Sequence, residues 1–359
     1  MPFRDVVGHV RLIPLLARAV ARGTLPPSLL FAGPSGIGKR LTAIAVAQAL
    51  NCTESQVASR QSSVASRQSP VDSRQSSVDS RQSSVDACGV CAACTRIARG
   101  VHPDVLIIEP GDTGAIKIEQ VRDIVDQAGY RPFEGRRRVV IIDEADALVT
   151  AAQHALLKTL EEPPPSSIFI LVTARPKVLL ATVRSRCPEL RFRQLAAGEI
   201  ASVMVARGHS ESEARAVAAT ADGSLGHALQ ASAGELVEAR EVAQRVLKHA
   251  STVQDPARRL EGAKALLSKT GASGDTEREQ LSSHLRAMAS LLRDVEVLAT
   301  RADERTLANP DVRPELEQLT ETYRGERGVR AFGAVDRALM AIESNVNVKL
   351  VADWLVLQL

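Results

Sequence analysis

Residues 33–40 read GPSGIGKR and have the pattern of a loop that binds phosphate groups. The apolar run Ser28 to Phe31 precedes the loop, and the Ala-rich run Leu41 to Leu50, which we expect to be helical, follows it. In such a loop the glycines let backbone N–H groups turn toward phosphate oxygens, and the lysine reaches the outer phosphates. The sequence therefore predicts a nucleotide site built from Gly33, Gly36, Gly38 and Lys39.

The last position of this loop departs from the pattern. A Ser or Thr hydroxyl normally stands there and holds magnesium, whereas this chain has Arg40, which cannot ligate a cation. Most phosphate contacts in such a loop come from the backbone, so binding of ATP or ADP can persist. Magnesium binding and efficient hydrolysis are in doubt.

A second acidic motif follows about 100 residues downstream, where residues 139–146 read VVIIDEAD. An apolar strand that ends in carboxylates is typical of the partner motif of a phosphate loop. We expect Asp143 to lie near the metal position and Glu144 to be placed to orient an attacking water. The alternative is an acidic first turn of the next helix, stabilised by the helix dipole.

Four cysteines could hold a metal ion. Cys88, Cys91 and Cys94 form C-x2-C-x2-C, and Cys52 precedes them once the repeat at residues 59–86 is left out. Four thiolates at such short spacing suit tetrahedral zinc. An iron–sulfur cluster and free thiols are the alternatives. Cys187 stands apart and is not expected to be a ligand.

Residues 59–86 form a low-complexity insert in which the unit SRQSSVD recurs four times with small changes. Each unit has one apolar residue where a coiled coil needs two. The insert cannot bury a core, and we predict a disordered loop.

The elements that must position these residues alternate between strand and helix up to about residue 194. Strands are expected at 105–108, 139–142 and 168–172, and helices at 118–128 and 151–161. This alternation predicts an α/β fold with a parallel sheet that is covered on both faces. Beyond residue 194 the pattern is helical, with short helices expected at 199–207, 212–220 and 225–231.

The C-terminal region contains an apolar seam with 4-3-4-3 spacing, which either an internal bundle or a partner subunit would explain. Its members are Leu281, Leu285, Met288, Leu292 and Val295. The apolar stretch Val346 to Leu359 should be packed, because an exposed tail of that kind would be a liability.

Composition bounds the class of protein. Of the 359 residues, 45% are hydrophobic, 24% are charged and only 3% are aromatic, as in a globular protein whose core is mostly aliphatic. The net charge of +3 does not by itself indicate a nucleic-acid binder. No apolar run approaches the ~18 residues of a membrane span, and residues 1–10 do not resemble a signal peptide, so we expect no membrane association and a cytoplasmic protein.

Together these motifs resemble bacterial clamp-loader subunits of the AAA+ class. The resemblance includes the phosphate loop, the cysteine module after its helix, the acidic strand and the triplet Ser185-Arg186-Cys187. It also includes RPFEGRR at residues 131–137, LLKTLEEPP at 156–164 and NVKL at 347–350. It covers the whole chain apart from the insert.

The family has two close branches. The gamma/tau type hydrolyses ATP, and the delta-prime type supplies an arginine finger to a neighbouring ATPase subunit. The resemblance implies that Arg186 is that finger, acting in trans, and that Thr173 stands at the phosphate-sensing position. Arg40, together with Gly226 where active relatives carry an arginine, favours the delta-prime type. Glu144 would then be a vestige of the catalytic site.

The resemblance implies a subunit of the DNA polymerase III clamp loader. It would assist ATP-driven loading of the sliding clamp onto primed DNA, in a hetero-pentamer with gamma/tau and delta subunits. The expected domains are an AAA+ core with the zinc module at 1–193, a helical lid at 194–240 and a helical collar at 241–359. The open alternatives are a gamma/tau-type ATP-hydrolysing motor subunit and a scaffold that binds no nucleotide.

Overall fold

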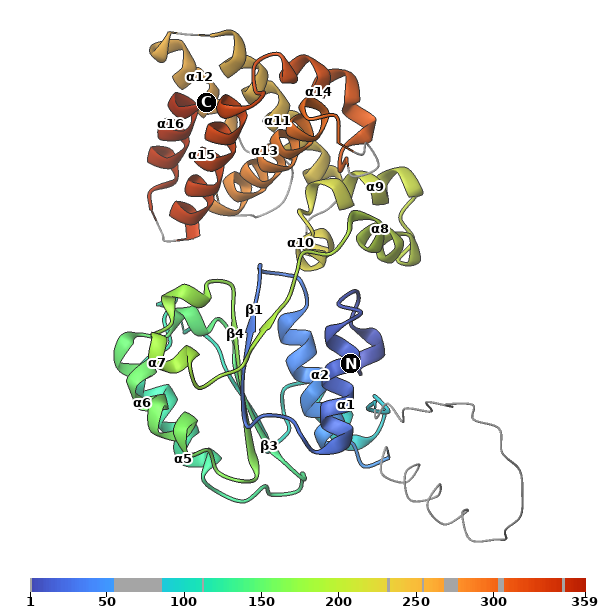
Figure 1. Ribbon diagram of the computed structural model, residues 1–359, viewed down its shortest axis with the longest axis vertical. Helices are drawn as coiled ribbons and strands as arrows, with labels where there is room; N and C mark the ends of the chain where they lie inside the picture. Colours follow the sequence, from blue (N-terminus) through green and yellow to red (C-terminus); the bar gives the residue numbers. More distant parts are fainter. Residues whose placement is uncertain are drawn as a thin grey trace, which may run out of the picture. The chain divides into compact units, whose positions relative to one another are not determined.

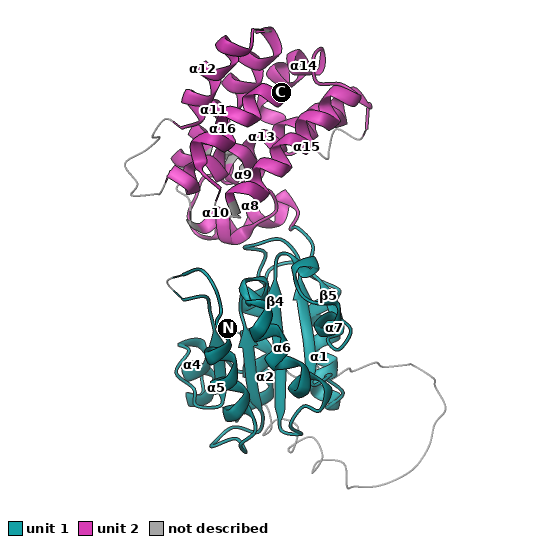
Figure 2. Cartoon of the chain, turned by 90° about the vertical axis from the view of Figure 1, so that its left-hand side faces the viewer, with its two compact units in different colours: residues 1–194 teal, residues 195–359 magenta. Residues whose placement is uncertain are grey.

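The computed structural model describes residues 2–54, 86–111, 113–230, 233–253, 255–267, 277–302, 307–343 and 346–359. The chain divides into two compact units, residues 1–194 and 195–359, which Figure 2 shows in different colours. The predicted boundary at 193 falls beside this division. The further division at residue 240 stays a prediction. Residues 59–85 of the repeat insert lie outside the described residues.

The first unit is built on a five-stranded sheet with the strand order β2-β3-β4-β1-β5, in which every paired strand is parallel to its neighbour. The strands are β1 (Ser28–Ala32), β2 (Val105–Ile108), β3 (Arg138–Ile142), β4 (Ser167–Thr173) and β5 (Glu189–Arg191).

Helices cover both faces of this sheet (Figure 1). On one face lie α1 and α2, and on the other lie α5, α6 and α7. The helices are α1 (Leu12–Arg22), α2 (Lys39–Asn51), α4 (Ala92–Ala98), α5 (Ile118–Ala128), α6 (Thr150–Glu161) and α7 (Ala181–Arg184). Short 3-10 turns are η1 (Phe3–Asp5), η2 (Ala145–Ala147) and η3 (Pro176–Val178).

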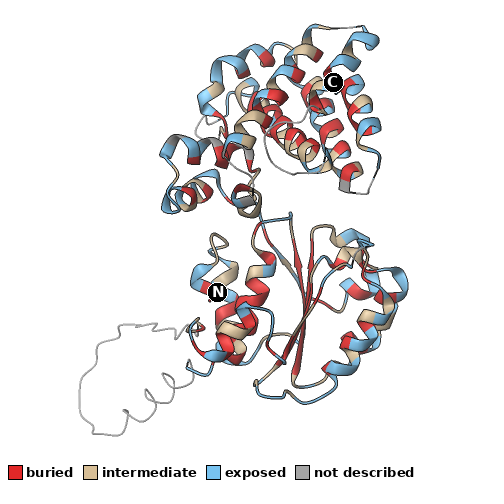
Figure 3. Cartoon of the chain, turned by 180° about the vertical axis from the view of Figure 1, so that it is seen from behind, coloured by how far each residue is buried: buried red, intermediate tan, exposed pale blue. Residues whose placement is uncertain are grey.

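The central strands are buried along their whole length, as Figure 3 shows in red. Successive side chains of β3 enter opposite cores: Val139 and Ile141 pack against α1 and α2, while Val140 and Ile142 pack against α5 and α6. A strand that is apolar on both faces can be stable only inside such a sandwich of helices. The predicted α/β fold is confirmed.

A buried carboxylate ties β2 to the loop before β3. Asp104 is fully buried and accepts hydrogen bonds from the backbone N–H groups of Phe133 (2.7 Å), Glu134 (2.9 Å) and Gly135 (2.7 Å). It also pairs with Arg138 at 2.9 Å. Burial alone would raise the pKa of Asp104, but these donors lower it to about 2. One carboxylate therefore holds three successive N–H groups of the RPFEG segment.

The second unit consists of helices in the part of the chain that the structure describes. Its helices are α8 (Ala197–Ala206), α9 (Glu211–Thr220), α10 (Leu225–Gln230), α11 (Ala233–Thr252), α12 (Pro256–Leu266), α13 (Glu277–Ala299), α14 (Arg313–Thr320), α15 (Glu326–Glu343) and α16 (Val348–Gln358), with a 3-10 turn η5 (Pro310–Val312). None of these described helices, nor any in the first unit, is both long and apolar enough to span a membrane.

The apolar seam of α13 packs inside this unit. All five of its side chains are buried, in a core that also contains residues of α11 and α15. The internal bundle, rather than a partner subunit, accounts for the seam. In α16, Val351, Leu355 and Val356 are buried as expected, while Leu350 keeps 63% of its surface exposed.

Several elements of the first unit were not predicted, namely α1, α4, α7, β5 and the three short 3-10 turns. Strand β5 has only three residues, and the alternate ones are exposed, so it has no apolar signature. Helix α1 buries only Leu16 and Ala17 fully. The predicted strands and helices were otherwise placed to within two residues of their observed bounds.

We expect Asp104→Asn to destabilise the first unit. The amide removes the charge that pairs with Arg138, which is itself buried, and losing one partner of a buried ion pair costs roughly 3–5 kcal/mol. Urea unfolding at neutral pH measures this loss. Because the folded pKa lies below the ordinary value of about 3.9, the stabilisation is present above pH 4 and is lost as the pH falls toward 2.

The matched control is Asp123→Asn, which changes an exposed carboxylate on α5. It should leave the unfolding free energy almost unchanged. The difference in unfolding free energy between Asp104→Asn and wild type should become smaller as the pH falls from about 4 to 2. A gap that is independent of pH in this range would contradict the role assigned to Asp104.

Candidate functional site

The phosphate loop lies between the end of β1 and the start of α2, as predicted. The N–H of Gly33 donates to the carbonyl oxygen of Thr173 at 3.2 Å, which fixes the loop to the end of β4. Gly33 has φ of 151°, and a Cβ there would lie 2.4 Å from the carbonyl oxygen of Phe192. Gly38, with φ of 96°, precedes the helix. Only glycine fits these two positions, because other residues would be strained or would clash with the backbone.

Lys39 is folded back onto this loop. Its Nζ donates to the carbonyl oxygens of Gly33 at 2.6 Å and Pro34 at 2.5 Å. The residue is 6% exposed, and burial lowers the pKa of Lys39 to about 8 although Asp143 and its neighbours oppose the shift. The ammonium group therefore lies in the loop where an anion would be bound.

The acidic residues Asp143 and Glu144 follow β3 directly. The N–H of Glu144 donates to Oδ1 of Asp143 at 3.0 Å, and Glu144 has a left-handed backbone with φ of 48°. Burial, followed by the negative charge of Asp143, raises the pKa of Glu144. The sheet thus brings both predicted acidic residues to the edge that carries the phosphate loop.

Arg40 connects the loop helix to this acidic edge. Its Nη1 donates to Oδ2 of Asp143 at 3.1 Å, and its Nη2 forms an ion pair with Oε1 of Glu109, the residue that follows β2. The guanidinium therefore bridges the ends of two neighbouring strands. The acidic partners were foreseen in part: Asp143 was predicted for this edge, and Glu109 was not.

Thr173 lies at the end of β4, where its hydroxyl donates to Oδ1 of Asp146 at 2.6 Å and accepts from the N–H of Arg175 at 3.0 Å. The Nε of Arg175 donates to the other oxygen of Asp146 at 2.8 Å. Burial would raise the pKa of Asp146, but these hydrogen bonds lower it. The role of Thr173 as a phosphate sensor stays a prediction.

Sequence reasoning missed four residues of this site. Glu109, Asp146 and Arg175 all follow the carboxyl end of a strand, which is a signal that could have found them. No such signal exists for His9, whose Nε2 lies 2.8 Å from the carbonyl oxygen of Ile37 and whose ring contacts that of Phe192 edge to face.

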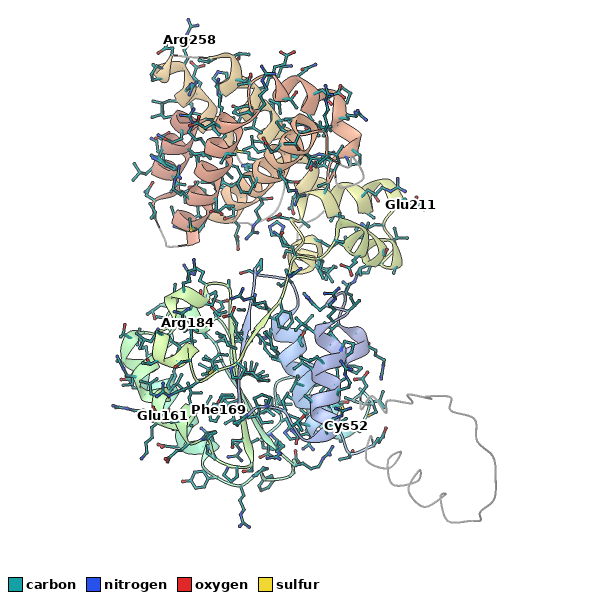
Figure 4. The ribbon with its side chains drawn as sticks, viewed as in Figure 1. Cys52, Glu161, Phe169, Arg184, Glu211 and Arg258 are labelled. Atoms are coloured by element: carbon teal, nitrogen blue, oxygen red, sulfur yellow. The ribbon has the colours of Figure 1, made fainter. Side chains whose placement is uncertain are left out.

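Among the described residues, the hydrogen bonds and ion pairs of Arg186 do not involve the phosphate loop. It follows α7, where its Nη1 donates to the carbonyl oxygen of Thr182 at 2.8 Å and its Nη2 pairs with Glu161 at the end of α6. Figure 4 labels Glu161 and Arg184 on this side of the sheet and Cys52 on the opposite side. Gly226 lies in α10 of the second unit.

The four predicted cysteines converge at the end of α2. The Sγ atoms of Cys52, Cys88, Cys91 and Cys94 lie within 4.8 Å of one another. Tetrahedral zinc with Zn–S bonds of about 2.3 Å requires S···S distances of about 3.8 Å, and Sγ of Cys88 lies 4.0 Å from Sγ of Cys94. A metal ion could be held there, and Cys187 lies in a separate core.

Backbone N–H groups point at these sulfur atoms. The N–H of Cys88 donates to Sγ of Cys52 at 3.3 Å, and that of Cys91 donates to Sγ of Cys88 at 3.2 Å. Such donors stabilise thiolates, which are the form that ligates metals. Burial raises the pKa of the Cys94 thiol, and a cation bound beside it would favour its thiolate form.

Several polar contacts join this cysteine cluster to the rest of the unit, among them that of Arg4, whose Nη2 donates to the carbonyl oxygen of Cys88 at 2.7 Å. Gln48 of α2 donates to the carbonyl oxygen of Cys94 at 2.7 Å, and Arg136 donates to that of Cys52 at 2.7 Å. Asp86, the last residue of the repeat insert, accepts from the backbone N–H of Phe3 at 2.8 Å.

Comparison with known proteins finds relatives among the subunits of DNA polymerase III. Residues 71–196 match the family described as "DNA polymerase III, delta subunit". The chain is 32% identical to subunit gamma/tau of DNA polymerase III from Mycobacterium tuberculosis H37Rv over 193 residues, which are 54% of this chain and 29% of that protein. It is 32% identical to subunit tau from Escherichia coli K12 over 233 residues, 63% of this chain and 32% of that protein.

A delta-prime protein is also among the relatives. Subunit delta' of DNA polymerase III from Pseudomonas aeruginosa is 35% identical over 156 residues, which are 43% of this chain and 39% of that protein. The chain thus spans less than half the length of these curated relatives. Among solved structures, a gamma subunit-related protein of DNA polymerase III from Thermotoga maritima aligns with 95% of this chain and over 96% of its own chain. The two sequences are 18% identical and the TM-score is 0.37, which is too low to carry an argument about function.

The low pKa of Lys39 predicts how nucleotide binding depends on pH. A bound phosphate raises the pKa of this lysine again, so that binding takes up a proton once the pH exceeds about 8. The affinity for ADP should be constant below that pH and should fall by roughly tenfold between pH 7 and pH 9. Titration with a fluorescent ADP measures it.

Lys39→Arg is the matched control, because a guanidinium stays charged throughout this range. This variant should show no decline in ADP affinity between pH 7 and pH 9. An equal decline of ADP affinity in the wild type and in Lys39→Arg would show that another group titrates.

Proposed function

We propose, from the premise that this chain is a homologue of the AAA+ clamp-loader subunits of DNA polymerase III, that it acts in DNA replication as a clamp-loader subunit of the delta-prime type. In this role it assists ATP-driven loading of the sliding clamp onto primed DNA. Gamma/tau-type and delta subunits are its partners, in a hetero-pentamer.

Arg40 is the observation that supports the delta-prime type over a gamma/tau-type motor. Its guanidinium occupies the position of the magnesium-binding hydroxyl and pairs with Asp143, the carboxylate that would help to hold the ion. Gly226 at the lid position supports the same reading, since a glycine cannot stabilise phosphate charge. Such a site can retain ATP or ADP through Gly33, Gly36, Gly38 and Lys39 without turning it over, with Glu144 as a vestige.

The active contribution of the subunit is then made in trans by Arg186. In phosphoryl transfer, negative charge is spread over the transferred group, and a guanidinium from a separate subunit stabilises it. In the described contacts Arg186 pairs with Glu161 and keeps 31% of its side chain exposed. Docking beside a neighbour's ATP would exchange this carboxylate for phosphate oxygens.

The two units fit this division of labour. We assign residues 1–193 to an AAA+ core, 194–240 to a helical lid and 241–359 to a helical collar for oligomerisation. The cysteine cluster holds one zinc ion, because four thiols, three of them buried, lie at suitable separation and backbone N–H groups donate to sulfur atoms among them. Zinc here supplies cross-linking of the chain rather than chemistry.

Reconstitution with the motor and delta subunits tests the proposal as a whole. Clamp loading and ATPase activity are measured on primed DNA with and without this chain. We expect the isolated chain to hydrolyse ATP negligibly and the complex to need it for full activity. Robust turnover by the purified chain alone would instead support a gamma/tau-type motor.

Elemental analysis tests the zinc assignment. We expect about one zinc per chain, and we expect Cys91→Ser to lose metal and to lower the thermal stability of the first unit. Cys187→Ser is the control, because this cysteine is also buried but lies outside the cluster. A metal-free wild type that folds stably in chelator would exclude the site.

Substitution of Arg186 tests the finger. Arg186→Ala should leave the chain folded and the complex assembled, while the partner's ATPase falls by roughly 10³-fold or more, the range measured for such fingers. Arg186→Lys should restore little, because an ammonium lacks the planar fork of donors.

Arg184→Ala is the internal control, since Arg184 is two residues away, exposed and equally charged. It should leave the ATPase rate nearly unchanged. Equal effects of both alanine variants would indicate general attraction to DNA or phosphate. A normal ATPase rate in the Arg186→Ala complex, at saturating ATP and primed DNA, would exclude Arg186 as an arginine finger.

A further inference from the structure

The edge of the sheet beside the phosphate loop is crowded with charged side chains. Four carboxylates lie there, at the ends of β2 and β3 and in η2: Glu109, Asp143, Glu144 and Asp146. Three cations face them, namely Lys39, Arg40 and Arg175. How these charges are paired determines whether a divalent cation can enter.

The two arginines form ion pairs with three of these four carboxylates. Arg175 pairs with Asp146 alone, and Arg40 bridges Asp143 and Glu109. Asp143 is the least exposed of the three partners of this bridge, with 14% of its side chain accessible against 44% for Arg40. Its second oxygen accepts from the N–H of Glu144 at 3.0 Å. Both oxygens of Asp143 are therefore engaged.

These residues do not fit a magnesium ion. In phosphate-loop proteins the ion is held by the loop hydroxyl and by the carboxylate after the second strand, together with the phosphates. Here the hydroxyl is replaced by a cation that has no lone pair to offer. That cation, the guanidinium of Arg40, also forms an ion pair with the carboxylate of Asp143. A divalent ion in the same place would have to break the ion pair and would meet a like charge.

We propose that the guanidinium of Arg40 is a tethered replacement for magnesium, so that this chain binds nucleotide polyphosphates without a divalent cation. The inference rests on the proposed binding of nucleotide by this loop. It adds that the cation is covalently part of the protein, that it is already placed by Asp143 and Glu109, and that added magnesium brings no affinity.

The charge requirement of the phosphates supports this assignment. In phosphate-loop sites, magnesium bridges the outer phosphates and offsets their charge. In this chain the two consecutive residues Lys39 and Arg40 begin α2, so that at neutral pH two side-chain cations are added to the positive end of the helix dipole. The site can therefore neutralise phosphate oxygens with its own groups.

Titration of the full chain with a fluorescent ADP, in excess magnesium and separately in excess EDTA, tests the proposal. For the wild type we expect dissociation constants that agree within about twofold, which is less than 0.5 kcal/mol. For Arg40→Thr, which restores a hydroxyl and frees Asp143, we expect binding at least about tenfold tighter in magnesium than in EDTA.

Bound Mn²⁺, detected by electron paramagnetic resonance, gives a second readout that does not depend on hydrolysis. With ADP in excess, Arg40→Thr should retain protein-bound Mn²⁺, and Arg40→Thr combined with Asp143→Asn should lose it. Arg22→Thr is the matched control: it removes an exposed arginine from α1, outside the site, and should behave as wild type in both measurements.

Three outcomes would overturn the inference, and they are distinct from one another. Wild-type binding that requires magnesium would overturn it while leaving nucleotide binding intact. Binding by Arg40→Thr that stays independent of magnesium would show that Arg40 is not the cause. Failure of every variant to bind ADP under both conditions would remove this inference and the nucleotide-binding part of the proposed function, while clamp loading by the reconstituted complex would still be judged separately.

Discussion

In a parallel sheet all strands end on the same edge, and in the first unit this constraint gathers acidic residues and Thr173 beside the phosphate loop. β1 ends at the phosphate loop, β2 at Glu109, β3 at Asp143 and β4 at Thr173. These residues are separated by up to 140 positions in the chain, yet the order β2-β3-β4-β1 makes their strands neighbours. The apolar strands that build the core therefore also determine which side chains meet at its edge.

Such an edge has an electrostatic cost that the protein must offset. Glu109 and Asp143 repel each other, and the raised pKa of Glu144 reflects burial together with these neighbouring charges. In a phosphate-loop ATPase a bound metal ion relieves part of this repulsion only when nucleotide is present. A tethered guanidinium relieves it permanently. Arg40 thus pairs with two carboxylates of this edge that would otherwise repel each other.

The sequence was informative wherever function depends on a backbone pattern or on short spacing. The phosphate loop, the acidic residues after β3 and the four cysteines were all found, because glycine positions, apolar strands and C-x2-C spacing are local signals. Contacts between distant side chains were not found. That Arg40 meets Glu109, that Thr173 donates to Asp146 and that Arg186 pairs with Glu161 all depend on side-chain packing across separate elements. Strand β5 was not predicted because its pairing with β1, rather than its own composition, makes it a strand.

Helix α2 connects the phosphate loop to the cysteine cluster within the same unit. The helix begins at Lys39 beside the loop and ends at Asn51, with Cys52 as the next residue, so that 13 residues and about 20 Å of helix separate the two sites. Its last turn is held from outside: Asn51 accepts from the N–H groups of Arg136 and Arg137, and Gln48 donates to Cys94. Because Asp104 organises the same segment that meets Asn51, the cysteine cluster and the buried carboxylate fix one end of the helix together. A helix that is held at that end places its other end, with Lys39 and Arg40, in one defined position. A site whose cation is an arginine side chain depends on the position of the helix more than a site that binds a free metal ion.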